Sequence, residues 1–174
     1  MADLVEIKLD FAQVQNALRN LQAAAGNLTP AFKVIGHALK ESTQHRFETT
    51  TGPDGEKWED NSNATISNYV HSVGGTKSKD GKLLSKKGEK RWDNKKPLSG
   101  KSGELMDSIN FNASDHTLIL GSPMEYAAMQ QFGGTKAEFP HLWGDIPARP
   151  FLGLSNADEA EILKIIEQHI DNAF

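Results

Sequence analysis

Two prolines near the C-terminal end of the chain place the strongest limit on its fold. Pro147 and Pro150 stand on either side of Arg149, and Phe151 follows them directly. Proline fixes its own φ and moves the preceding residue out of the helical region, so residues 146–153 cannot form a helix. We expect this segment to be an extended edge piece of a β-sheet that enters the core at Phe151.

Arg149 is the polar residue of this segment that we single out, because the two prolines fix the backbone around it. A guanidinium held in this way typically makes a bidentate pair with a carboxylate or caps backbone carbonyls. Two interpretations stay open, namely a structural bridge within the chain and a contact between subunits. We take Arg149 and Phe151 together as candidate contact residues.

Two further motifs precede this segment. Residues 102–109 predict a short capped helix that runs into a strand, and residues 126–134 predict a helix that ends at paired glycines, with Phe132 as its last apolar residue. The loop at 135–145 that follows is too apolar for ordinary exposure to solvent. We expect it to fold back on the core or to pack on a neighbouring subunit. Phe132 at the end of the helix and Trp143 in the loop are the candidate contacts.

Hydrophobic periodicity predicts the remaining elements. The expected elements are a strand at Val5–Leu9, helices at about 10–26 and from Thr29 towards Phe47, a hairpin at 109–120, and a last helix from Asn156 with Glu159 as its capping partner. Gly36 inside the second helix predicts close packing there. The fold class is therefore α+β, with a single domain over residues 1–174 and an antiparallel sheet of about four strands flanked by helices.

The stretch from about residue 61 to 97 has almost no periodic signal. Residues 76–101 carry 10 basic and 3 acidic groups, a net charge of +7, against −3 for residues 1–75 and −8 for residues 102–174. We expect a long, mobile basic insertion, as either a loop that orders on assembly or a solvated loop without a partner. Segregated charge favours contact with nucleic acid or with an acidic face of a sister subunit. The candidate contact residues are Lys86, Lys87, Lys90 and Arg91.

Signs of catalysis and of metal binding are weak. The chain has no cysteine, and its six histidines form no His-x-x-x-His pair. Residues 100–102 match the end of a phosphate-binding loop, but Lys95 stands where that motif needs glycine. Asp158 and its acidic neighbours lie in the first turns of a predicted helix, where negative charge is stabilising. We therefore expect no metal, no cofactor and no enzymatic activity.

Membrane insertion is not expected either. No apolar run approaches the roughly 18 residues that span a bilayer, and the N-terminus lacks the pattern of a signal peptide. We expect the protein to stay in the cytoplasm where it is made.

Together and in this order, the three motifs resemble the phage virion morphogenesis family, the tail-completion proteins of Mu-like and P2-like phages and prophages. The resemblance rests on Phe132-Gly133-Gly134 combined with residues 146–153. It extends back to Arg46-Phe47 and to Gly52-Pro53-Asp54-Gly55 followed by Trp58, and so covers most of the chain.

The resemblance implies a structural protein that completes the tail and helps to join it to the head. It implies a homo-oligomeric ring, with a hexamer as the expected form, that contacts other tail or head-tail connector proteins. DNA passing through the ring is a further candidate partner. The expected location is the host cytoplasm during assembly and then the virion, at the tail or the head-tail junction. The alternative is a nucleic-acid-binding protein that uses the lysine-rich segment 76–101.

Overall fold

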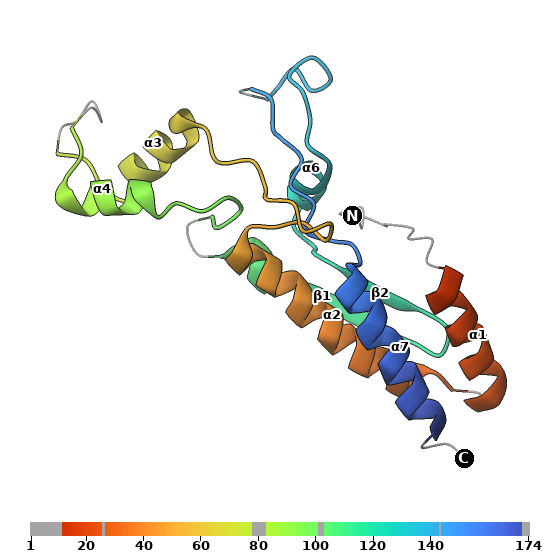
Figure 1. Cartoon of the computed structure of the whole chain (residues 1–174). Coiled ribbons are helices and arrows are strands. Elements are labelled where there is room, and N and C mark those ends of the chain that lie inside the picture. Colours follow the sequence, from red (N-terminus) through yellow and green to blue (C-terminus); the bar gives the residue numbers. More distant parts are fainter. Residues whose placement is uncertain (1–11, 26, 78–82, 101–102, 143, 172–174) are drawn as a thin grey trace.

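Helix α2 (Thr29–Thr49) is the central element of the computed structural model, which describes residues 12–25, 27–77, 83–100, 103–142 and 144–171. Proline at its first turn suits a helix start, and Phe32, Ile35 and Leu39 form its buried stripe. Helix α7 (Asn156–Asp171) packs along both α2 and α1 (Ala12–Ala25), as Figure 1 shows. These three helices confirm the helical periodicity of the sequence.

A β-hairpin covers α2. Strands β1 (Asn110–Ala113) and β2 (Leu118–Gly121) pair antiparallel, and both contact α2. A Cβ added to Gly36 of α2 would lie 2.4 Å from a ring carbon of Phe111, so this helix and strand approach as closely as only glycine permits. The structure therefore confirms both the hairpin and the close packing expected at Gly36.

The sheet is smaller than predicted. Within the described residues it has two strands rather than about four, and the expected strand at Val5–Leu9 lies outside those residues. The prediction that residues 146–153 form a sheet edge is wrong, because only an isolated bridge between Gly134 and Ile146 forms there. Proline has no N–H to donate to a ladder, and the N–H groups of Arg149, Phe151 and Leu152 bond to Gln130 and Gln131 of α6 instead.

The long basic loop is also a wrong prediction, because helices α3 (Asn63–Ser72) and α4 (Lys86–Asp93) occupy much of it. The two helices pack on each other and form an arm to one side of the body, as Figure 1 shows. Ser62 and Ser85 cap them, each accepting a hydrogen bond from a backbone N–H three residues on. We call the described residues of 62–94 the arm; its mobility stays a prediction.

Glycines allow the arm to pack without an apolar stripe. A Cβ on Gly88 of α4 would lie 1.9 Å from the carbonyl oxygen of Gly75, so the helix lies directly on the backbone that follows α3. Ser85 adds a backbone and a side-chain hydrogen bond to the same Gly75 carbonyl, both of 2.9 Å. Val70 is the buried apolar side chain of α3. Sequence periodicity could not detect such a contact, because backbone rather than side chains makes it.

Buried residues form two clusters. The first fills the space between α1, α2, α7 and the hairpin, and Phe32, Ile35 and Ile166 are among its members. The second lies at the C-terminal end of α2, where Phe47, Trp58 and Phe151 meet residues of α5 (Glu104–Asp107) and α6 (Ala127–Phe132). The short helices α5 and α6 confirm the helices predicted within residues 102–109 and 126–134, although Gly103, the N-cap of α5, does not supply the predicted side-chain cap.

Helix α7 begins with a capping box one residue earlier than predicted. Asp158 donates its backbone N–H to the hydroxyl of Ser155 at 3.2 Å, and Ser155 returns a backbone hydrogen bond of 2.7 Å to the Asp158 carboxylate. The predicted pair of Asn156 and Glu159 is therefore wrong by one position. Across the described residues, no helix combines the length and apolar character needed to cross a bilayer.

Candidate functional site

Residues 146–153 are held in place by a buried glutamine. The side-chain amide nitrogen of Gln131, at the end of α6, donates to the carbonyl of Leu152 at 3.0 Å. Its oxygen accepts hydrogen bonds of 3.0 Å from the backbone N–H groups of Phe151 and Leu152. Gln131 is only 5% exposed, so the amide replaces a sheet neighbour for this segment. No sequence pattern singled out Gln131, although it directly precedes Phe132-Gly133-Gly134.

Arg46 of α2 holds the end of the same segment. One guanidinium nitrogen donates to the carbonyls of Phe151 and Gly153 at 2.9 Å each, and another lies 2.5 Å from a carboxylate oxygen of Asp158. Burial lowers the pKa of Arg46, and the Asp158 carboxylate opposes that shift. The guanidinium nevertheless stays charged, because arginine does not lose its proton in proteins. A buried ion pair thus joins α2, α7 and residues 146–153.

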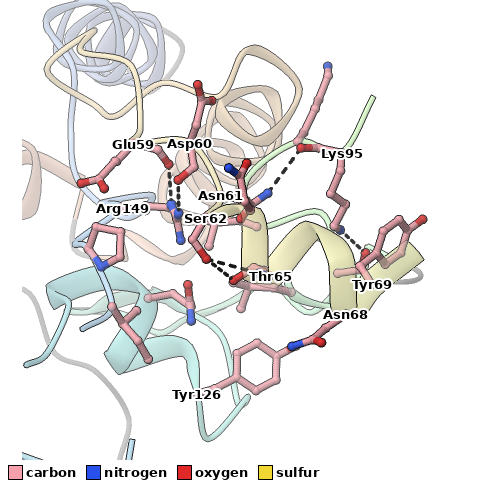
Figure 2. A pocket seen from close by; sticks show the side chains of 18 of the residues that line it. Glu59, Asp60, Asn61, Ser62, Thr65, Asn68, Tyr69, Lys95, Tyr126 and Arg149 are labelled. Atoms are coloured by element: carbon pink, nitrogen blue, oxygen red, sulfur yellow. Dashed lines mark hydrogen bonds between the residues drawn. The ribbon is translucent and has the colours of Figure 1, made fainter. Parts of the chain in front are cut away.

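Arg149 caps backbone carbonyls, one of the two partners that the sequence predicted for it. Its side chain donates to the carbonyl of Glu59 at 2.8 Å and to that of Asp60 at 3.1 Å, as Figure 2 shows. Burial lowers the pKa of Arg149, and the negative charges of Glu59 and Asp60 oppose this shift. Arg149 is 7% exposed, and in this conformation its contacts lie within the chain. It therefore fixes the connection that leads into the arm.

The chain segment that leads from α4 back to the body lies beside the segment that leads from the body to α3. The Asn61 side chain donates to the carbonyl of Lys95 at 3.3 Å, and Lys96 donates from its ammonium group to the carbonyl of Glu48 on α2 at 2.7 Å. The two connections thus leave and rejoin the body at one place.

A cavity of about 940 Å³ opens between the arm and α6. Figure 2 shows four side chains that face it: Tyr69 of α3, Lys95 just after α4, and Tyr126 and Arg149 of the body. The Lys95 ammonium lies 4.3 Å from the centroid of the Tyr69 ring, and burial lowers its pKa. Burial and the nearby Glu104 raise the pKa of Tyr126. No group of His, Asp or Glu side chains suited to a metal occurs among the residues that the structure describes.

The structure does not bring the predicted contact residues together. Phe151 is fully buried in the second cluster, and Arg149 lies in the body beside it. Arg91 is half-buried and donates to the carbonyl of Val73 at 2.5 Å, which fixes α4 to the end of α3. Trp143 lies outside the described residues. The exposed members of the predicted set are Phe132, Lys86, Lys87 and Lys90.

The exposed members belong to two separate surfaces. Phe132 is 62% exposed and shares a shallow groove with Phe139, Glu59, Glu138 and Asp145, which we call the aromatic patch. Glu138 accepts hydrogen bonds from the Thr135 hydroxyl and backbone N–H, and these lower its pKa. The three lysines lie on α4, and we call them the basic face of the arm.

These features define a class: a small protein of mixed helices and strands, with a core fixed by buried polar side chains and with charged and aromatic surfaces. More particularly, the chain belongs to the phage virion morphogenesis family, whose model matches residues 9–171. The resemblance that the three motifs indicated is therefore confirmed.

Similar proteins come from phage Mu and from Mu-like prophages. The putative capsid assembly protein G of Escherichia phage Mu is 28% identical over 170 residues, which cover 97% of this chain and 96% of that protein. The Mu-like prophage FluMu G protein 1 of Haemophilus influenzae is 27% identical over 166 residues, covering 95% and 94%. No solved structure shows a significant similarity to the chain.

Proposed function

We propose that this protein completes the phage tail and helps to join it to the head, as a homo-oligomeric ring without catalytic activity. The observation that carries the proposal is the family match over nearly the whole chain, residues 9–171. The description of the Mu relative as a putative capsid assembly protein supports an assembly role. The protein would act in the host cytoplasm and remain in the virion.

Two features of the structure support a ring. The chain presents two different exposed surfaces, the aromatic patch and the basic face of the arm, on separate parts of the molecule. A subunit that contacts its neighbours through two different surfaces forms a closed ring when the rotation closes, and we expect a hexamer. Other tail or head-tail connector proteins would then contact the ring.

The test is a gene deletion in the phage or inducible prophage that encodes the chain. Electron microscopy of the lysate should show heads and tails that fail to join, and expression of the wild-type chain should restore complete particles. Complete, infectious particles without the protein would refute the proposal. Light scattering on the purified protein, alone and with tails, measures the ring directly.

Nucleic-acid binding is the second candidate, because Lys86, Lys87 and Lys90 are exposed on α4 within the lysine-rich segment 76–101. Cations on one helix face can bind phosphates, and such binding falls steeply with salt. Stacking on bases lacks support, because Trp92 is half-buried. Affinity for double-stranded DNA, measured against salt for the wild type and for Lys86→Gln, Lys87→Gln, Lys90→Gln, tests this candidate.

A further inference from the structure

The aromatic patch has the make-up of a protein contact. Phe132 and Phe139 are 62% and 39% exposed, and the carboxylates of Glu59, Glu138 and Asp145 lie around the same groove. None of these three carboxylates forms an ion pair within the described residues. Exposed rings with a charged rim are typical of surfaces that bind another protein.

The basic face of the arm has the complementary make-up. Lys90 follows Lys86 by four residues and Lys87 by three, so the three lysines share one side of α4, while Gly88 faces Gly75 on the other. Leu83, which precedes α4, has a side chain that is 58% exposed. The arm thus offers three cations and, three residues before the first of them, one exposed apolar side chain.

We propose that the basic face of the arm of one copy docks on the aromatic patch of the next copy. Leu83 then packs against Phe132 and Phe139, and the three lysines face Glu59, Glu138 and Asp145. Opposite charges of this kind steer encounter and fix the register of a contact. The proposal rests on the ring of the proposed function and names the surfaces that join its subunits.

The geometry requires two molecules for this contact. Figure 1 shows α4 on the arm and α6, which ends at Phe132, on a different part of the molecule. Because the two surfaces differ, each copy donates its arm to one neighbour and receives the arm of the other, and the contact repeats around a ring.

A second copy fits the basic face better than nucleic acid does. A phosphate backbone would leave the exposed Leu83 side chain without an apolar partner. The aromatic patch supplies apolar rings for Leu83 and carboxylates for the three lysines.

The test uses one variant for each surface. The arm variant carries Lys86→Glu, Lys87→Glu and Lys90→Glu, and the patch variant carries Phe132→Asp. Each variant alone lacks one half of every contact and should associate at least about tenfold more weakly than the wild type, because contacts at the interface are lost or become repulsive. An equal mixture retains a single intact contact, so light scattering should show a dimer that grows no further.

Matched control variants separate the contact from general effects of charge and exposure. Lys33→Glu, Lys57→Glu and Lys164→Glu make the same change in net charge at exposed positions outside the arm. Val34→Asp replaces an apolar side chain on α2 that is 54% exposed. Both controls should form the wild-type oligomer, and circular dichroism should show native helix content for all variants.

Several outcomes would overturn the inference. They are wild-type rings in either surface variant, a mixture that stays monomeric, and a wild-type chain that is monomeric at roughly 0.1 mM, where a contact with a Kd near 1 µM is saturated. An arm variant that keeps its rings and loses only DNA affinity assigns the lysines to nucleic acid instead. The deletion experiment is independent: unjoined heads and tails together with persistent rings would leave the proposed function standing and reject this contact.

Discussion

Residues 146–153 and the arm are fixed by opposite means. Three side chains from other elements, Arg46, Gln131 and Trp58, bond to the backbone of residues 146–153 in the interior. In the arm, α4 lies on the backbone at Gly75 with little side-chain packing. The difference teaches that hydrogen bonds from polar side chains can hold a segment that its prolines keep out of a sheet. It also teaches that glycines can pack a helix through direct backbone contact where no apolar stripe is available. Changes in the first region should affect the whole fold, and changes in the second should stay local.

The largest effect should come from Asp158→Ala, which leaves the buried guanidinium of Arg46 without its carboxylate. Removing one partner of a buried pair costs about 3–5 kcal/mol of unfolding free energy. Urea unfolding measures the loss. The control is Glu161→Ala, because Glu161 pairs with Lys164 at the surface and should cost less than about 1 kcal/mol. Equal losses in the two variants would show that the buried pair has no special role.

Gln131→Ala should have the next largest effect. The change leaves the N–H groups of Phe151 and Leu152 and the carbonyl of Leu152 without partners in the interior. Each unsatisfied buried group costs about 1–3 kcal/mol, and water entering the space left by the side chain offsets part of this, so we expect about 2–4 kcal/mol in urea unfolding. Gln130→Ala, a change on the same helix at a less buried position, is the comparison. A stability within error of the wild type would contradict the role assigned to Gln131.

Gly88→Ala should unfold the arm while the body stays folded. The new methyl group would meet the Gly75 carbonyl oxygen at 1.9 Å, so α4 must move away. Overpacking of this kind costs about 1–3 kcal/mol. Hydrogen exchange should show lost protection in α4 and unchanged protection in α2 and α7. Gly121→Ala is the control, because nothing lies within 4 Å of its added Cβ. Lost protection in α2 would mean that the arm and the body unfold together.

Lys95 should give the smallest effect. Burial lowers its pKa below the ordinary value of 10.5, so the native state binds this proton less tightly than the unfolded chain does. Stability should therefore rise with pH through the window just below 10.5, where the unfolded chain still holds the proton. Because Lys95 is only half-buried and solvent screens its charge, the rise should stay under about 1 kcal/mol. Urea unfolding at increasing pH should show it in the wild type and not in Lys95→Met.

Much of the body could be predicted from the sequence, because its helices carry apolar stripes. Phe32, Ile35 and Leu39 indicated α2, and the alternation around Phe111 indicated the hairpin. The arm could not be predicted, because Gly75 and Gly88 leave no periodic signal. The capping box of α7 was misplaced by one residue, since the tertiary contact of Asp158 with Arg46 decides it.

The candidate site was predictable in part. The prolines around Arg149 indicated a fixed guanidinium with either a carboxylate or backbone carbonyls as its partner, and the structure shows carbonyls. Phe132 is exposed at the end of its helix. Phe151 was grouped with the contact residues, but its ring fills the second cluster of the core. Gln131 was missed because an amide at a helix end has no sequence pattern of its own. Its buried role depends on where residues 146–153 pass.

The paired connections of the arm have a consequence for how such proteins diverge. Arg149 fixes the backbone just before α3, and Asn61 donates to the carbonyl of Lys95 just after α4, so the insertion begins and ends at one point. A segment with adjacent ends can be shortened, lengthened or exchanged without moving the core. The arm is therefore a unit whose length and surface can change while the two clusters of buried residues stay in place.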